Sequence, residues 1–387
     1  MKQRRPLARL RQRIRDSAPA DKYVLWVALV LAAIGILAVY SAISFLAETK
    51  ANGDTERFLL RHAIRLVLAL AALAVFSFLD YHTLTRWARV LLLGSLFLLL
   101  LVQIFGVTYG GSTRAFRLGT LSLQPSDVAK VALILYLGVL LARKQDYIKS
   151  ISRTFVPIFV WVFASVLLIG IEDLSTAAVL LVAVGLMCFI GRVSAAQLGI
   201  LAVVGIVCAL LLLRTSPNRA ARVEAYLGIG VFSHTDDADV FNPQAEGYQA
   251  RQARIAFALG GLGGRGPGKS LQRDFLPAPY NDFIFAVVAE EYGLLGALTL
   301  LGLFVVMLLC GYLRIARQAI DPLGLFLAVG YTTTIVLFGY IHAAVATGPL
   351  PVTGLPLPLV SYGGSSMVTT GAMIGIVLNI SRQARKQ

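Results

Sequence analysis

Apolar residues gather in runs of roughly 18–25 along most of this chain, and each run is long enough to cross a hydrocarbon core of about 30 Å as a helix. Only 14% of the 387 residues are charged, whereas 57% are hydrophobic. A soluble protein needs more charge to cover its surface, since average chains carry about 25% Asp, Glu, Lys and Arg. The sequence therefore predicts an all-α polytopic membrane protein.

The apolar runs predict about ten transmembrane helices in a single membrane domain, residues 23–381, between short basic tails at 1–22 and 382–387. A large polar loop at 214–282 separates the seventh helix from the eighth. The helices are expected at 23–46, 59–79, 88–107, 125–142, 155–172, 174–191, 196–213, 283–309, 322–346 and 364–381.

The net charge of +15 is concentrated beside the predicted helix ends and in the two tails. Basic residues next to membrane spans set orientation and attract anionic lipid headgroups, so this charge predicts contact with membrane lipids and no nucleic acid. Placing tail 1–22 in the cytoplasm puts the basic loops of the same side there too. Both termini are then cytoplasmic, and loop 214–282 lies outside.

Metal and disulfide chemistry find little support in the sequence. The four histidines are scattered without metal-ligand spacing, and the three cysteines lie inside apolar runs, where thiols behave as small hydrophobes. The sequence therefore predicts no metal site made by protein side chains alone.

The outer loop 214–282 contains two notable stretches. Residues Gln244–Leu262 mix apolar and polar residues as an amphipathic interfacial helix does. Residues Gly263–Ser270 satisfy the P-loop formula, but no buried strand precedes them and prolines follow closely. We expect no ATP binding here. Lys269 remains a candidate point charge for a phosphorylated substrate.

Asp127 and Lys130 stand at i,i+3 near the start of the fourth helix, so they share a face. A helix-dipole acid and a snorkelling lysine are the simpler interpretation. Lys130 lies about a turn and a half into the span, however, where a charge is costly without a partner. The sequence favours a cavity-lining pair, with Arg114 and Arg117 in the loop before it.

Asp282 directly precedes the eighth helix, and its residue type fits two roles, a helix cap or a general base at the rim of a cavity. The residues alone leave these open. Glu172 and Asp173 fit helix capping in a tight turn. Residues 349–358 are too rich in proline for a helix and predict a non-helical wall that leads to Ser361.

Four stretches together resemble the SEDS family of membrane glycosyltransferases, nearer its FtsW branch than its RodA branch. They are Gly111–Lys130, Gly247–Gln249, Leu276–Gly296 and Thr353–Ser366, and they occur in the family's order across nearly the whole chain. Two positions depart from the usual pattern. Asp127 stands where the family commonly has Glu, and Tyr280-Asn281 stand where it commonly has His-Thr.

The resemblance implies a peptidoglycan glycosyltransferase of the bacterial inner membrane that polymerises lipid II into glycan strands for septal synthesis in cell division. It implies Asp282 as the catalytic carboxylate, Mg²⁺ or Mn²⁺ as a candidate helper, and partners in a class B penicillin-binding transpeptidase and division proteins. The predicted substrate-binding residues are Arg114, Arg117, Asp127, Lys130, Gln249, Lys269 and Ser361, of which Asp127 and Lys130 occupy cavity positions of the family. A lipid II flippase and a non-catalytic division scaffold remain the alternatives.

Overall fold

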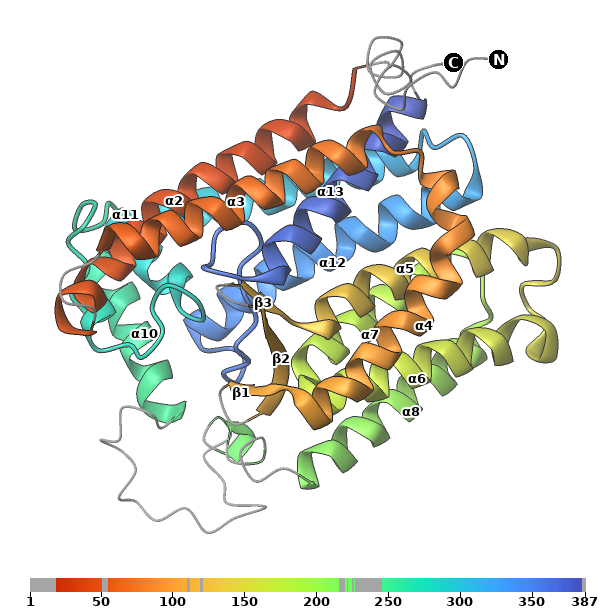
Figure 1. The fold of residues 1–387 in the computed structure, drawn as a ribbon, viewed down its shortest axis with the longest axis horizontal. Helices are drawn as coiled ribbons and strands as arrows, with labels where there is room; N and C mark the ends of the chain where they lie inside the picture. Colours follow the sequence, from red (N-terminus) through yellow and green to blue (C-terminus); the bar gives the residue numbers. More distant parts are fainter. Residues whose placement is uncertain are drawn as a thin grey trace.

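The computed structural model describes residues 19–50, 55–109, 112–118, 121–215, 220, 222–224, 226 and 246–384. Within these ranges, long helices run roughly side by side along one axis (Figure 1). Most of the two predicted tails and residues 227–245 of the predicted loop lie outside the described residues. The helical fold class is confirmed, with one small sheet in addition.

Each of the ten predicted ranges is occupied by a helix. They are α2 (Lys22–Lys50), α3 (Thr55–Phe78), α4 (Tyr81–Phe105), α5 (Pro125–Arg143), α6 (Val156–Glu172), α7 (Leu174–Ile190), α8 (Ala195–Arg214), α11 (Ile284–Leu309), α12 (Pro322–Thr347) and α13 (Ser365–Ala384). Short π-helical turns, η2 (Ile151–Phe155) and η5 (Cys310–Ala316), extend α6 and α11, and a 3₁₀ turn, η1 (Gln145–Tyr147), follows α5.

The largest boundary error is the start of α4, which we predicted at 88 and which lies at Tyr81. The side chain of Asp80 accepts a hydrogen bond from the backbone N–H of His82 at 3.0 Å and so caps the helix. Because the first turns of α4 are polar, the apolar run alone marked its start too late.

Eight of the described helical stretches are long and apolar enough to cross a membrane. Helix α7 is apolar but has only 17 residues. Helix α13 is less apolar because serine and threonine fill its first turns. The exact number of membrane crossings therefore stays a prediction.

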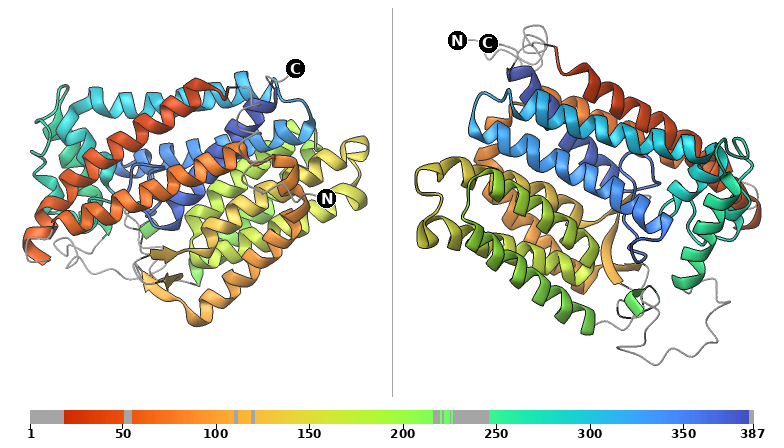
Figure 2. Two further views of the ribbon diagram at one scale, coloured as in Figure 1. Left: turned by 45° about the horizontal axis from the view of Figure 1, so that its top comes forward. Right: turned by 180° about the vertical axis from the view of Figure 1, so that it is seen from behind.

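The helices form two groups that meet along α12. Helices α2, α3, α12 and α13 lie together, α4–α8 form the second group, and α12 packs against both α5 and α7 (Figure 1). Gly371 and Gly375 of α13 lie against the backbone of Ala69 and Leu73 of α3, so the absence of a side chain permits this close approach. The start of α2 and the end of α13 lie at the same end of the molecule (Figure 2).

A small antiparallel sheet occupies most of the segment between the predicted helices 88–107 and 125–142, which we predicted as a loop. Its order is β1 (Val107–Tyr109), β2 (Ser112–Leu118) and β3 (Leu121–Leu123). The prediction missed it because strands this short show too little alternation to be recognised. The sheet packs at the ends of α4 and α5 and places Arg114 and Arg117 on β2.

Helix α11 is broken at Gly293, inside the range 283–309 that we predicted as one helix. Gly293 has φ 67° and ψ −166°, a conformation that residues with a Cβ rarely adopt. The break leaves backbone N–H and C=O groups of α11 without partners inside the helix. Residues 261–270, which follow α10 and which we call the glycine-rich loop, form hydrogen bonds with them. Leu294 donates its N–H to Gly261 O at 2.9 Å, while Gly266 donates to Glu291 O at 2.9 Å. The loop thus satisfies groups that would be costly to leave unpaired.

Two further expectations concern the segments around this break. Helix α10 (Glu246–Gly260) confirms a helix within the predicted Gln244–Leu262, and it packs against α11 and α12. A 3₁₀ turn, η4 (Gln272–Asp274), follows the glycine-rich loop. Residues 348–364 contain no helix, as the prolines of 349–358 predicted.

Replacing Gly293 should destabilise the protein. In Gly293→Ala the new Cβ would meet the backbone of Leu262 and Gly264, and the positive φ would be strained, together costing about 1–3 kcal/mol or more. Thermal unfolding of the purified protein measures the loss. Gly302→Ala on the same helix is the matched control, because a Cβ there meets nothing within 4 Å and should leave stability equal or higher. Equal effects of the two variants would contradict the assigned strain.

Candidate active site

Asp127 and Lys130 form a buried ion pair that joins α5 to α13. Lys130 Nζ donates to Asp127 Oδ1 at 2.7 Å, and the predicted i,i+3 contact is therefore present. Ser365 Oγ donates to the second oxygen, Asp127 Oδ2, at 2.6 Å. Ser365 Oγ also accepts from the backbone N–H of Gln124 at 2.9 Å. Pro125, at the first turn of α5, places these groups at the start of the helix.

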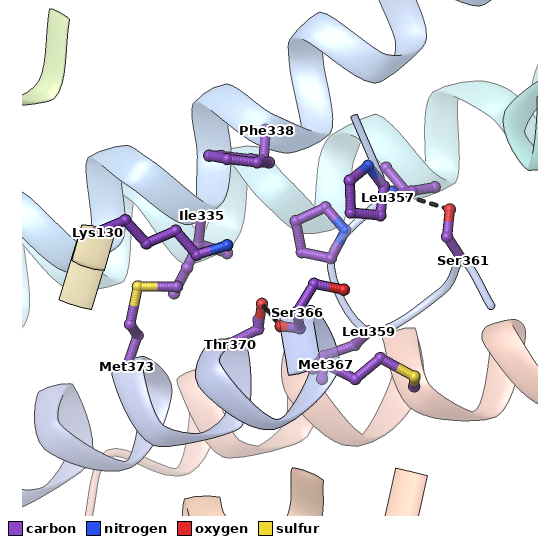
Figure 3. Close-up of a pocket in the computed structure, with 12 residues that line it drawn as sticks. Lys130, Ile335, Phe338, Leu357, Leu359, Ser361, Ser366, Met367, Thr370 and Met373 are labelled. Carbon is purple, nitrogen blue, oxygen red and sulfur yellow. Dashed lines mark hydrogen bonds between the residues drawn. The ribbon is translucent and has the colours of Figure 1, made fainter. Parts of the chain in front are cut away.

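A narrow cavity lies beside Lys130, and Figure 3 shows the residues around it. The ammonium of Lys130 lies 4.7 Å from the centre of the Phe338 ring, a cation–π distance. Thr370 of α13 and Leu357 of the non-helical segment also line the cavity. Its volume is about 10 Å³, room for about one water molecule. A sugar does not fit there in this conformation.

Ser361 holds the non-helical segment against the residues before α11. Its Oγ donates to Asn281 O at 2.7 Å and accepts from the backbone N–H of Leu357 at 2.8 Å. Tyr362 N–H donates to Tyr280 O at 2.9 Å. Because the hydroxyl of Ser361 is engaged in these two bonds, its geometry favours positioning the chain next to Asp282 over contacting substrate itself.

Asp282 lies directly before α11, facing the non-helical segment. In the part of the chain that the structure describes, its Oδ1 is closed off from solvent and has no hydrogen-bond partner. Gly354 faces this carboxylate, and a Cβ there would lie 3.8 Å from Oδ2. Burial raises the pKa of the Asp282 carboxyl; the charges of Arg114 and Arg222 oppose the rise, and Asp173 adds to it.

Glu172 and Asp173 were both predicted to cap helices, and their surroundings differ. Asp173 Oδ1 accepts from the backbone N–H groups of Ser175 and Thr176 at 3.0 and 3.1 Å, which confirms it as the cap of α7. Glu172 is only 2% exposed, and neither of its oxygens has a hydrogen-bond partner among the described residues. A buried carboxyl without donors is costly and points to a role other than capping.

Arg114 connects these carboxylates. Its charge acts on Asp282 and on Glu172, and the charge of Asp127 also acts on Glu172. The structure thus gathers Asp282, Glu172, Arg114 and the Asp127–Lys130 pair into one group. The sequence missed Glu172 and Arg222 as members, because nothing local distinguishes them from other polar residues at helix ends.

Three other predicted substrate-binding residues show no hydrogen bond or ion pair to this group among the described residues. Arg117 of β2 is exposed, Gln249 is half-buried on α10, and Lys269 is exposed on the glycine-rich loop. Within the described ranges, the structure shows no hydrogen bond or ion pair from any of them to Asp282. Their proposed contact with substrate rests on the sequence.

The glycine-rich loop is already occupied by a carboxylate of the protein. Glu290, which is fully buried, accepts from Ser270 Oγ at 2.6 Å and from the backbone N–H groups of Leu271 and Gln272 at 2.8 and 3.1 Å. Leu271 and Gln272 directly follow the motif, whereas a P-loop holds phosphate with the backbone N–H groups of the motif itself. The hydroxyl of Ser270 is thus engaged by a carboxylate of the protein, and the absence of ATP binding stays a prediction.

No group of three His, Cys, Asp or Glu residues that could hold a metal ion occurs among the described residues. Mg²⁺ commonly takes one or two carboxylates together with substrate phosphates. The described side chains do not by themselves form a metal site, so we derive no step through a metal.

The comparisons with known proteins agree on one family. Residues 21–386 match the family model described as "Cell cycle protein", whose name joins FtsW, RodA and SpoVE. The chain is 36% identical over 370 residues to "Probable peptidoglycan glycosyltransferase FtsW" of Geobacter sulfurreducens, covering 94% of this chain and 96% of that protein. It is 36% identical over 369 residues to "Stage V sporulation protein E" of Bacillus subtilis, covering 94% and 98%.

Solved structures show the same fold. One, titled "Structural coordination of polymerization and crosslinking by a peptidoglycan synthase complex", has TM-score 0.73 and 27% identity and covers 95% of this chain and 99% of the other. The rod shape determining protein RodA of Thermus thermophilus has TM-score 0.68 and 25% identity, with 95% and 98% covered.

The fold and the buried charged group define a multi-pass membrane protein with a polar site where a broken helix meets a non-helical segment. The family match covers nearly all of the chain, and the relatives are matched over nearly their whole length. The chain belongs to the FtsW/RodA/SpoVE family.

Glu172 and Glu290 should respond oppositely to loss of charge. Glu172→Gln replaces a buried carboxylate that has no donors by an uncharged amide and should raise the free energy of unfolding by about 1–2 kcal/mol. Glu290→Gln places an amide N–H₂ against N–H donors and should lower it by a similar or larger amount. Thermal unfolding of both purified variants tests this. A loss of stability in Glu172→Gln would show that Glu172 has donors after all.

Proposed function

We propose that this chain is a peptidoglycan glycosyltransferase that polymerises lipid II into glycan strands during septal wall synthesis, with Asp282 as general base. The family and the names of its relatives support the reaction class. The observation that carries the proposal is the carboxylate of Asp282, which is partly enclosed, has one oxygen without a partner and has a raised pKa. A base with a raised pKa accepts a proton more readily near neutral pH.

The reaction is an inverting glycosyl transfer. Asp282 takes the proton of the acceptor sugar's 4-hydroxyl, and that oxygen attacks the anomeric carbon of the growing strand. The new glycosidic bond forms as the bond from the anomeric carbon to the diphosphate breaks, and the electron pair leaves with the polyprenyl diphosphate. Because this leaving group is already a stable anion, it needs cationic stabilisation and no general acid.

The chain's own residues supply orientation and charge. Ser361 and Tyr362 tie the non-helical segment to the residues before α11 and so fix the backbone on either side of Asp282. Arg114 lies within electrostatic reach of Asp282 and Glu172 and is placed to stabilise negative charge near the base. Asp127 and Lys130 brace α5 against α13 beside this group, and in the proposal Lys130 also faces substrate.

The setting is proposed with the reaction. The chain is placed in the bacterial inner membrane with both termini cytoplasmic and Asp282 on the outer side, where lipid II presents its sugars. A class B penicillin-binding transpeptidase and division proteins are the proposed partners. The structural relative titled as a peptidoglycan synthase complex, which couples polymerization and crosslinking, supports such a partnership.

Asp282→Asn should lower the rate of lipid II polymerisation by about 10²–10⁴-fold, the usual contribution of a general base. Gel analysis of glycan products from the purified protein, with and without the transpeptidase, measures the rate. Asp146→Asn, an exposed carboxylate in η1, is the control and should polymerise normally. A folded Asp282→Asn protein with the wild-type rate would refute the assignment.

The charge of Arg114 predicts a pH effect. The base acts when ionised, so activity falls as pH drops through the pKa of Asp282, which lies above the usual aspartate value. Arg114 opposes that rise, and Arg114→Gln should therefore move the acid limb of kcat/KM to higher pH. Arg117→Gln on the same strand should leave the limb in place, whatever it does to the rate. If the acid limb of kcat/KM lies at the same pH in Arg114→Gln as in the wild type, the electrostatic interaction between Arg114 and Asp282 is contradicted.

The same purified protein separates the two alternative functions. A flippase would move labelled lipid II across liposome membranes without forming glycan. A scaffold would support division equally well with Asp282→Asn. Glycan formation that depends on Asp282 excludes both as the main activity.

A further inference from the structure

A second cavity, of about 410 Å³, lies between α10 and the segment that follows α12. This volume is within the range of about 300–1,000 Å³ that is usual for small-molecule sites. Three arginines line it, Arg222, Arg251 and Arg254, and the described residues that line it include no Asp or Glu. Its other wall is apolar and is formed by Leu350, Pro351 and Val352. We call it the arginine cavity.

Several backbone features build this cavity. Arg251 and Arg254 stand at i,i+3 on α10, so both belong to one face of that helix. The guanidinium of Arg254 lies against Gly348, where a Cβ would come within 2.5 Å of Nε. Gly348 ends α12 with φ 100°, and its missing side chain leaves room for Arg254. Tyr226 Oη donates to Pro349 O at 2.5 Å and holds the opposite wall.

The arginine cavity is electrostatically connected to the proposed base. Arg222 lines the cavity, and its charge also acts on the carboxyl of Asp282. A ligand anion held by Arg222, Arg251 and Arg254 would therefore lie within electrostatic reach of the proposed base. Guanidinium groups bind phosphate oxygens in pairs, with directional, charge-assisted hydrogen bonds.

We infer that the arginine cavity binds the diphosphate of a polyprenyl-diphosphate-linked saccharide, with the apolar wall against the first isoprene unit. This inference rests on the proposed function and assigns the cations that stabilise its leaving group. The breaking bond joins the anomeric carbon to a diphosphate oxygen, and the negative charge that develops on that oxygen is the charge the arginines face. An anionic phospholipid headgroup offers the same chemistry, and the test separates the two.

Binding of a diphosphate in the arginine cavity also affects the pKa of Asp282, the proposed base. A bound diphosphate neutralises Arg222, which opposes the rise in the pKa of Asp282. Asp282 therefore becomes a stronger base when substrate is present. In the wild type, the acid limb of kcat, which reports the substrate complex, should lie at higher pH than that of kcat/KM. In Arg222→Gln the acid limb of kcat/KM should lie at higher pH than in the wild type, because the free enzyme has lost a charge that opposes the rise.

The experiment measures binding of undecaprenyl diphosphate, with undecaprenyl monophosphate for comparison, to the full chain in phosphatidylcholine nanodiscs. Asp282→Asn serves as the background so that no turnover occurs. Replacing Arg251 and Arg254 together by Gln should weaken diphosphate binding about 10- to 100-fold. The control replaces Arg86 and Arg89 by Gln, which are exposed, have the same i,i+3 spacing on α4 and give the same change in net charge. It should bind as the parent does.

Each outcome of this experiment supports or overturns either the inference or the proposed function. Equal diphosphate affinity in the Arg251/Arg254 variant and its control, in a chain that polymerises lipid II when Asp282 is intact, overturns the inference and leaves the proposed function standing. Failure of the intact chain to polymerise overturns the proposed function, and the binding measurement still reports on the cavity. If nanodiscs of phosphatidylglycerol abolish diphosphate binding through the same arginines, the cavity is a phospholipid site and the inference is wrong.

Discussion

A carboxylate inside an apolar helix bundle has to find its donors within the protein, and this constraint organises the fold. Asp127 is satisfied by Lys130 and Ser365, and the bonds join α5 to α13. Glu290 is satisfied by the glycine-rich loop, and the bonds fix that loop on the broken helix α11. Asp282 and Glu172 are the exceptions among these four, since they keep oxygens without partners in the described structure. Asp127 and Glu290 thus hold parts of the fold together through their hydrogen bonds, whereas Asp282 and Glu172 have oxygens that remain able to accept a proton or a hydrogen bond.

The sequence predicted what periodicity and local chemistry determine. Apolar runs located ten of the helices that the structure describes, spacing put Asp127 beside Lys130, and the prolines excluded a helix at 349–358. It did not predict the break at Gly293. A single glycine is tolerated inside a helix, and only the positive φ seen in the structure shows that the helix is interrupted there. Glu172 and Arg222 were missed for a different reason: their significance comes from neighbours on other helices or from the outer loop.

The glycine-rich stretch shows how a motif can be present without its usual chemistry. Its residues fit the P-loop formula, yet its own backbone N–H groups donate to backbone carbonyls, and an anion is held by Ser270 and the two residues that follow it. That anion is the carboxylate of Glu290, eight residues after Asp282 along the chain. The surrounding structure decides the outcome, since no strand leads into the loop and a broken helix lies beneath it. The cavity that does present free volume and arginines has no sequence motif at all.

The attachment of the loop to α11 has a mechanical consequence. Gly260, at the end of α10, lies against the backbone of Ala289, and Glu290 clamps the loop that follows. Helix α10, the loop and the first segment of α11 are therefore joined by direct contacts, and Asp282 comes just before that segment. A displacement of α10 would thus be passed through backbone contacts toward the proposed base.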